Sequence, residues 1–249
     1  MHEAVISLLV GAALIGASLG SAALYRALPE KHRQAETEEI VRLIANIFVV
    51  LASLVLGLMI NSARSTFDGV DKAVHAYATE LILLDRTLKQ YGPETADARR
   101  HLQAYAQQAS RQMAQSDPVL GSRTAETLLN DIGNAVRALR PPDADRIDLK
   151  ARSEQRFEKV YEMRWALVEQ SEGTIPLPLI ALTAAWLVLV FASYGYRAPR
   201  NPITSISFVV SAVLIAGTVY LTLDMDIPFD GIIQVSPMPL ERALAEMQK

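Results

Sequence analysis

The sequence predicts an all-α polytopic membrane protein with four transmembrane helices and a helical extramembrane domain between the second and third spans. Apolar residues make up 51% of the 249 residues, and the mean hydropathy is +0.18. They gather in four windows without Asp, Glu, Lys or Arg, at residues 4–25, 43–63, 174–196 and 201–223. Each window matches the roughly 20 apolar residues that cross a bilayer core. Residues 62–172 hold 16 basic and 17 acidic side chains, so this region lies in water.

The first window favours a packed membrane helix, because Gly16 and Gly20 form a GxxxG pair that lets another backbone approach closely. The second window runs into apolar positions spaced by three and four residues from Phe67 to Tyr91. This spacing is typical of a helix that packs along one face. Apart from Gly69, no turn residue separates the two segments, so we expect one long helix that leaves the membrane and enters a bundle.

The remaining elements follow from the turn signals. The motifs Gly92-Pro93, Asp117-Pro118 and Pro141-Pro142 divide the polar region into four helices. The tight link at residues 197–202 makes the third and fourth spans an antiparallel hairpin, and a short amphipathic helix is expected near residues 240–247. The predicted domains are residues 1–63 (spans one and two), 64–172 (helical bundle), 173–223 (spans three and four) and 224–249 (juxtamembrane segment and tail).

Composition excludes several classes of function. The chain has no cysteine and no HExxH pair, so a thiolate nucleophile, a cysteine metal site and that zinc motif are ruled out. It contains no Walker loop, GxSxG or GxGxxG motif, and we expect no enzyme activity and no cofactor. A net charge of −3 argues against nucleic acid as a partner. The windows hold no acidic residue for a proton relay, which leaves a passive pore, a scaffold or a receptor.

The second window contains Ser53-Leu-Val-Leu-Gly57-Leu58 followed by Asn61-Ser62-Ala63. This motif is similar to the second helix of bestrophins, and the chain most closely resembles the divergent, uncharacterised bacterial members of that family. The segment at residues 227–231 looks like the family's Pro-Phe-Gly segment with its acidic residue. The order of spans and the long insertion after span two are also similar. The tryptophan pair that follows the neck in the family is replaced by residues 65–68, Ser-Thr-Phe-Asp.

The resemblance implies a bestrophin-like fold and a homopentameric ion channel, in which the second helix lines the axis and three apolar side chains form a neck. The matching positions are Val50, Leu54 and Leu58. At 100° per residue, five more residues lie within about 40° of the neck direction and would line the pore. They are Ile47, Asn61, Ser65, Asp68 and Lys72. The packing stripe with Val70, Val74 and Tyr77 lies on the opposite side, although any helix leaving a membrane becomes polar on its unpacked face.

The acidic residues Asp224, Asp226 and Asp230 allow two interpretations. Oxygen-rich clusters suit Ca²⁺, and the resemblance implies a calcium role for acids near this segment. The three carboxylates flank Pro228-Phe229 instead of forming a dense run after it. We therefore interpret them as a solvated juxtamembrane loop and predict no bound metal.

The sequence leaves two alternatives open, one for the orientation of the protein in the membrane and one for its function. The basic residues of the two short links would place those links in the cytosol, whereas the resemblance places the bundle and both chain ends there. We follow the resemblance and expect an integral protein of the bacterial inner membrane. Its expected partners are further copies of itself, membrane lipid and permeant ions. The alternative function is a non-conducting scaffold or sensor whose helical domain binds a protein partner.

Overall fold

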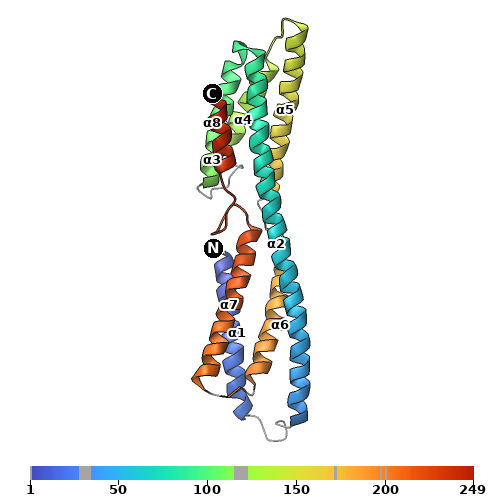
Figure 1. Ribbon diagram of the computed structural model, residues 1–249, viewed down its shortest axis with the longest axis vertical. Helices are drawn as coiled ribbons and strands as arrows, with labels where there is room; N and C mark the ends of the chain where they lie inside the picture. Colours follow the sequence, from blue (N-terminus) through green and yellow to red (C-terminus); the bar gives the residue numbers. More distant parts are fainter. Residues whose placement is uncertain (1, 28–34, 115–122, 171–172, 197, 200) are drawn as a thin grey trace. The chain divides into compact units, whose positions relative to one another are not determined.

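The computed structural model describes all residues except 1, 28–34, 115–122, 171–172, 197 and 200, and this described part is helical without strands (Figure 1). The all-α prediction is therefore confirmed. The elements in chain order are α1 (His2–Ala27), α2 (Ala35–Tyr91), the 3₁₀ turn η2 (Pro93–Thr95), α3 (Ala96–Ala114), α4 (Arg123–Arg137), α5 (Ala144–Glu169), α6 (Leu177–Gly195), α7 (Pro202–Asp226) and α8 (Met238–Met247). The predicted break at Asp117-Pro118 lies outside the described residues.

Four of these helices are long and apolar enough to cross a membrane, namely α1, α2, α6 and α7. The chain divides into two compact units. Residues 1–66 and 174–226 form the first, here called the membrane unit, and residues 67–173 and 227–249 form the second, here called the bundle unit. Helix α2 contributes its first part to one unit and its last part to the other.

Helix α2 is a single helix of 57 residues, as the sequence predicts. Its buried positions repeat at Ala45, Ala52 and Met59, and then at Ala63, Val70 and Tyr77. Steps of seven residues keep side chains on nearly the same face, because seven residues make almost two helical turns. The chain leaves the helix at Gly92, whose φ of 132° suits a residue without a side chain.

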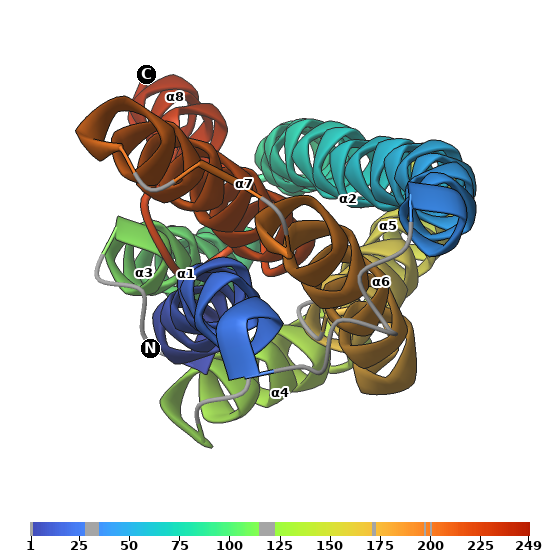
Figure 2. The same cartoon turned by 90° about the horizontal axis from the view of Figure 1, so that it is seen from below.

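In the membrane unit, α1 packs against α6 and α7, and Figure 2 shows these helices as neighbours. The predicted packing of the first membrane helix is confirmed, but not at Gly16 and Gly20, where a Cβ would meet no atom within 4 Å. The close approaches occur at Gly11 and Gly195 instead. A Cβ on Gly195 would lie 2.3 Å from the carbonyl oxygen of Ser18, so only glycine fits.

The first part of α2 joins the same unit through Met59, which packs with Ile180, Val219 and Leu223. The end of α7 is tied to the segment before α6. The carboxylate of Asp226 accepts hydrogen bonds from Thr174 Oγ1 at 2.7 Å and from the Ile175 amide at 2.9 Å. These two bonds fix the entry of the third span.

The bundle unit is built around large apolar side chains that are fully buried. They come from the last part of α2 and from α3, α4, α5 and α8, and they include Leu81, Leu84, Leu88, Leu102, Leu129, Ile132, Leu167 and Leu240. Burial of each such side chain contributes about 1.5–3 kcal/mol in water. Because this unit has an aqueous surface, the hydrophobic effect holds it together.

Polar ties add specificity to the bundle unit. Buried Glu80 on α2 accepts hydrogen bonds from Arg156 at 2.8 Å and Lys159 at 3.1 Å, both on α5. The Arg99 guanidinium donates to both oxygens of Asp85, at 2.8 and 3.0 Å. These charged hydrogen bonds fix the register of the helices they join.

The predicted C-terminal amphipathic helix is confirmed as α8, and its last turn is held by α3. Arg99 Nη2 and Gln103 Nε2 both donate to the carbonyl oxygen of Met247, at 3.3 and 2.9 Å. A helix leaves its last carbonyl groups without internal partners, and these donors satisfy one of them. The guanidinium also lies favourably at the negative end of the helix dipole.

Candidate functional site

The candidate site is the exposed face of α2 in the membrane unit. Val50, Leu54 and Leu58 are 67%, 60% and 60% exposed in the single chain. Helix α2 buries the opposite side, where Ala52 and Met59 pack against the rest of the membrane unit and are 1% and 3% exposed. The two faces lie about 150° apart at 100° per residue. The helix therefore has one side committed to its own chain and one side open to another partner or to lipid.

The five further residues of the predicted lining lie on the same face and are also exposed. Ile47 is 54% exposed, and Asn61, Ser65, Asp68 and Lys72 fall in the exposed class. Within the membrane unit the face extends about 27 Å from Ile47 to Ser65 at 1.5 Å per residue, and it changes from apolar to small polar side chains. The charged residues Asp68 and Lys72 lie in the part of α2 that belongs to the bundle unit. Whether these residues surround a pore depends on further copies of the chain, so their roles stay predictions.

Two residues of this face were not included in the predicted lining. Ile40 and Leu43 are 58% and 62% exposed and lie within about 40° of the neck direction. The same helical arithmetic, applied two turns further toward the start of α2, would have found them. The apolar part of the face thus begins at Ile40 and continues to Leu58, about 27 Å at 1.5 Å per residue.

The local structure keeps this face regular. The Ser53 hydroxyl donates to the carbonyl oxygen of Val49 at 2.7 Å, which satisfies it within the helix. Gly57 has no atom within 4 Å of the place where a Cβ would stand, so it opens space next to Leu58. On the buried side, Thr183 of α6 donates to the Leu179 carbonyl oxygen at 2.8 Å and lies 3.7 Å from the Met59 sulfur. The packed side of α2 therefore needs few polar partners. The change from apolar to polar side chains occurs on its exposed side.

The acidic residues at and after the end of α7 differ in burial and in their hydrogen bonds. Asp226 is occupied by the Thr174 and Ile175 donors, and Asp224 is buried at 2% exposure. The exposed Asp230 accepts a hydrogen bond from the Gly231 amide at 2.8 Å, and Gly231 has a φ of 95°. Within the described ranges, no three His, Cys, Asp or Glu side chains gather as a metal site would require. The interpretation of all three as a solvated loop is wrong for Asp224 and Asp226, which are buried.

Comparison with known proteins identifies the fold. The family model described as "Bestrophin-like domain" matches residues 12–240. The chain is similar to the crystal structure of a bacterial bestrophin homologue from Klebsiella pneumoniae that carries one mutation. The TM-score is 0.63 at 15% identity, and the alignment covers 98% of this chain and 99% of that chain. No curated protein sequence matches. The chain is thus an integral membrane protein that belongs to the bestrophin-like family.

Proposed function

We propose that the chain forms a homopentameric ion channel in which five copies of α2 surround a central axis. Val50, Leu54 and Leu58 form the neck, and Ile47, Asn61, Ser65, Asp68 and Lys72 line the remainder of the pore. The observation that carries the proposal is the order of residues on the exposed face of α2, where a polar row follows the apolar row in line. Family membership supports it.

Asn61 distinguishes a pore-lining face of α2 from a face that contacts only lipid. It is exposed in the single chain and lies within the uncharged window of residues 43–63. An amide exposed to hydrocarbon costs free energy, so a polar side chain in a span normally faces protein or water. Asn46, in the same window, accepts a hydrogen bond from Tyr194 at 2.8 Å. A water-filled pore would solvate Asn61 in a comparable way.

The neck would work as a hydrophobic gate. A narrow apolar constriction loses its water and then excludes ions, so small changes in its width change conductance strongly. The apolar face from Ile40 to Leu58 is longer than the three neck residues. We therefore expect a low conductance at rest and a large gain when the neck is widened.

The first experiment is the mass of the purified full-length protein in mild detergent, by native mass spectrometry. A pentamer would support the proposal, and a stable monomer or dimer would remove it. Bilayer recordings then compare the Leu54→Ala/Leu58→Ala variant with Ile60→Ala, a change on another face of the same helix. We expect the neck variant to raise conductance severalfold and the control to leave it near that of the natural chain. Equal currents in all three would exclude these residues from the pore.

The orientation belongs to the same proposal. We place the bundle unit and both ends of the chain in the cytosol and the protein in the bacterial inner membrane. A reporter pair fused after Lys249 tests this placement. Fluorescence of a cytoplasmic reporter is expected, whereas alkaline-phosphatase activity would reverse the topology.

A further inference from the structure

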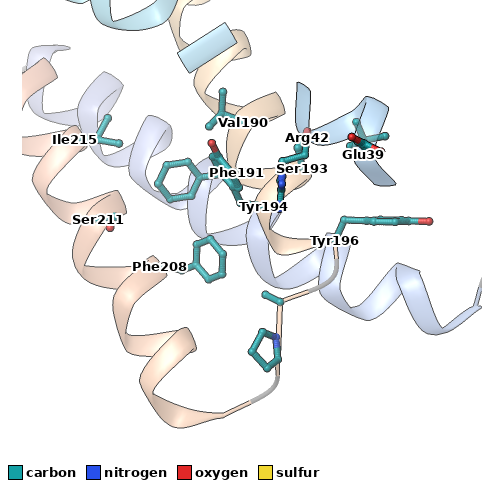
Figure 3. Close-up of a pocket in the computed structure, with 13 residues that line it drawn as sticks. Glu39, Arg42, Val190, Phe191, Ser193, Tyr194, Tyr196, Phe208, Ser211 and Ile215 are labelled. Carbon is teal, nitrogen blue, oxygen red and sulfur yellow. The ribbon is translucent and has the colours of Figure 1, made fainter. Parts of the chain in front are cut away.

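The membrane unit contains a pocket of about 890 Å³ where α2 begins and α6 ends, with α7 along one side (Figure 3). This size is within the range of about 300–1,000 Å³ typical of ligand pockets. Its polar wall carries Glu39 and Arg42 from α2 and Tyr194 from α6, and its apolar wall carries Phe191 and Phe208. The two phenylalanine rings lie 6.1 Å apart between centroids and line one side together.

The pocket lies at a membrane boundary. Glu39 and Arg42 immediately precede the uncharged window of residues 43–63, and Tyr194 and Tyr196 stand at the end of the window of residues 174–196. Tyrosine is enriched where a membrane meets water. The Tyr194 hydroxyl donates to Asn46 Oδ1 at 2.8 Å, which fixes its ring beside the pocket. The charged wall therefore lies at headgroup depth and the phenylalanine wall at acyl-chain depth.

The charges select the kind of headgroup. Glu39 and Arg42 are both exposed and stand about one turn apart on α2, so they offer one negative and one positive charge side by side. A phosphate accepts hydrogen bonds from a guanidinium, and a primary ammonium donates to a carboxylate. An anionic headgroup would be repelled by Glu39. A choline headgroup has no N–H to donate to it.

We propose that this pocket binds a zwitterionic phospholipid with a primary ammonium headgroup, that is, phosphatidylethanolamine. Its phosphate contacts Arg42, its ammonium contacts Glu39, and an acyl chain lies along Phe191 and Phe208. The proposal does not depend on ion conduction, since the pocket is built entirely within the membrane unit of one chain.

The test uses full-length protein freed of lipid in mild detergent and titrated with phosphatidylethanolamine, phosphatidylcholine or phosphatidylglycerol of equal acyl chains. Native mass spectrometry measures the lipid bound per chain. We expect phosphatidylethanolamine to bind at least about fivefold more tightly than the other two, as one added charged hydrogen bond allows. Glu39→Gln should remove this preference, and Arg42→Gln should weaken all three lipids. Equal affinities for the three lipids, or a preference that both variants leave unchanged, would overturn the proposal.

A steric variant and its control address the apolar wall. Ser211 lines the pocket on α7, whereas Val213 on the same helix is 59% exposed and does not line it. Ser211→Phe should abolish phosphatidylethanolamine binding and Val213→Phe should preserve it. A photo-crosslinking amino acid in place of Ser211 then reports the occupant directly. A covalent phosphatidylethanolamine adduct supports the proposal, and a crosslink to a second copy of the chain would overturn it.

Discussion

The two units of this chain differ in their closest helix contacts. In the membrane unit, α1 meets α6 and α7 through small residues and backbone, beside small apolar clusters around Leu14 and Met59. Gly195 of α6 meets Ser18 and Ser21 of α1 so closely that a Cβ would lie 2.3 and 2.5 Å from their oxygen atoms. A Cβ on Gly11 would lie 3.1 Å from that of Ala216. In the bundle unit, helices interlock through whole rows of leucine side chains that are fully buried.

The difference follows from the solvent around each unit. Lipid tails are as apolar as leucine, so burying a leucine between membrane helices gains little transfer free energy, and close contact between small residues matters more. In water, burial of apolar area is the main source of stability. One chain thus contains both kinds of helix packing. Matched substitutions in the two units can measure how much each kind contributes to stability.

The largest expected effect is at Gly195. Replacement by leucine places side-chain atoms where the Ser18 carbonyl oxygen already lies, so α1 and α6 must move apart to accommodate it. We expect the membrane unit to lose its folded packing, a loss of more than about 3 kcal/mol. Gly217→Leu is the control, because a Cβ at Gly217 would meet nothing within 4 Å.

Each unit contains one tryptophan, Trp186 in the membrane unit and Trp165 in the bundle unit. Single-tryptophan variants therefore report the unfolding of each unit by fluorescence. In the Gly195→Leu protein, the unfolding transition reported by Trp186 fluorescence should be lost. The Gly217→Leu protein should unfold like the natural chain. Normal unfolding of Gly195→Leu would mean that the close approach of α1 and α6 does not hold the unit together.

A smaller and more informative effect compares two leucines that are both 0% exposed, Leu102 in the bundle unit and Leu14 in the membrane unit. Leu102→Ala should cost about 3 kcal/mol, from lost transfer free energy and the cavity left behind. Leu14→Ala leaves a cavity as well, but its transfer contribution nearly vanishes beside lipid. We expect about half the loss, measured by thermal unfolding with Trp165 and Trp186 as reporters. Equal losses would show that both units depend on apolar burial alike.

The outline of the fold was predictable because its signals are local. Four uncharged windows, the spacing of apolar residues from Phe67 to Tyr91 and the Gly92-Pro93 stop depend on neighbouring residues, and they gave the spans and the long helix α2. The candidate neck could be proposed for the same reason, since Val50, Leu54 and Leu58 share one helix. Their pore role depends on several copies of the chain, and this information is not local.

Features that join distant segments could not be predicted. The contact of Ser18 with Gly195 and the pocket shared by Arg42 and Tyr194 each join residues far apart in the sequence. The GxxxG spacing of Gly16 and Gly20 shows that a close approach is sterically allowed, without showing which residue makes it. In this chain Gly11 makes one, toward Ala216.

The smallest expected effect on stability concerns a polar cluster inside the bundle unit, which differs from the rows of buried leucine side chains around it. The buried hydroxyl groups of Tyr77 and Tyr105 are hydrogen-bonded to each other, and Arg164, 1% exposed, also hydrogen-bonds to Tyr105. Burial raises the pKa of Tyr105 to about 12. The pKa of Tyr77 is raised well above its usual value, first by burial and then by Tyr105. Both tyrosines therefore stay protonated in the folded bundle at a pH where they ionise in the unfolded chain.

Between about pH 10 and pH 12 the folded state binds more protons than the unfolded state, so its stability falls as the pH rises. Below about pH 10 this contribution is fully present. We expect the Trp165 unfolding midpoint to drop between about pH 10 and pH 12 in the natural protein, and to drop less in the Tyr77→Phe/Tyr105→Phe variant. The variant should be less stable at neutral pH by about 1 kcal/mol, because a hydrogen bond is lost. An identical alkaline decline in both proteins would place its origin outside this cluster.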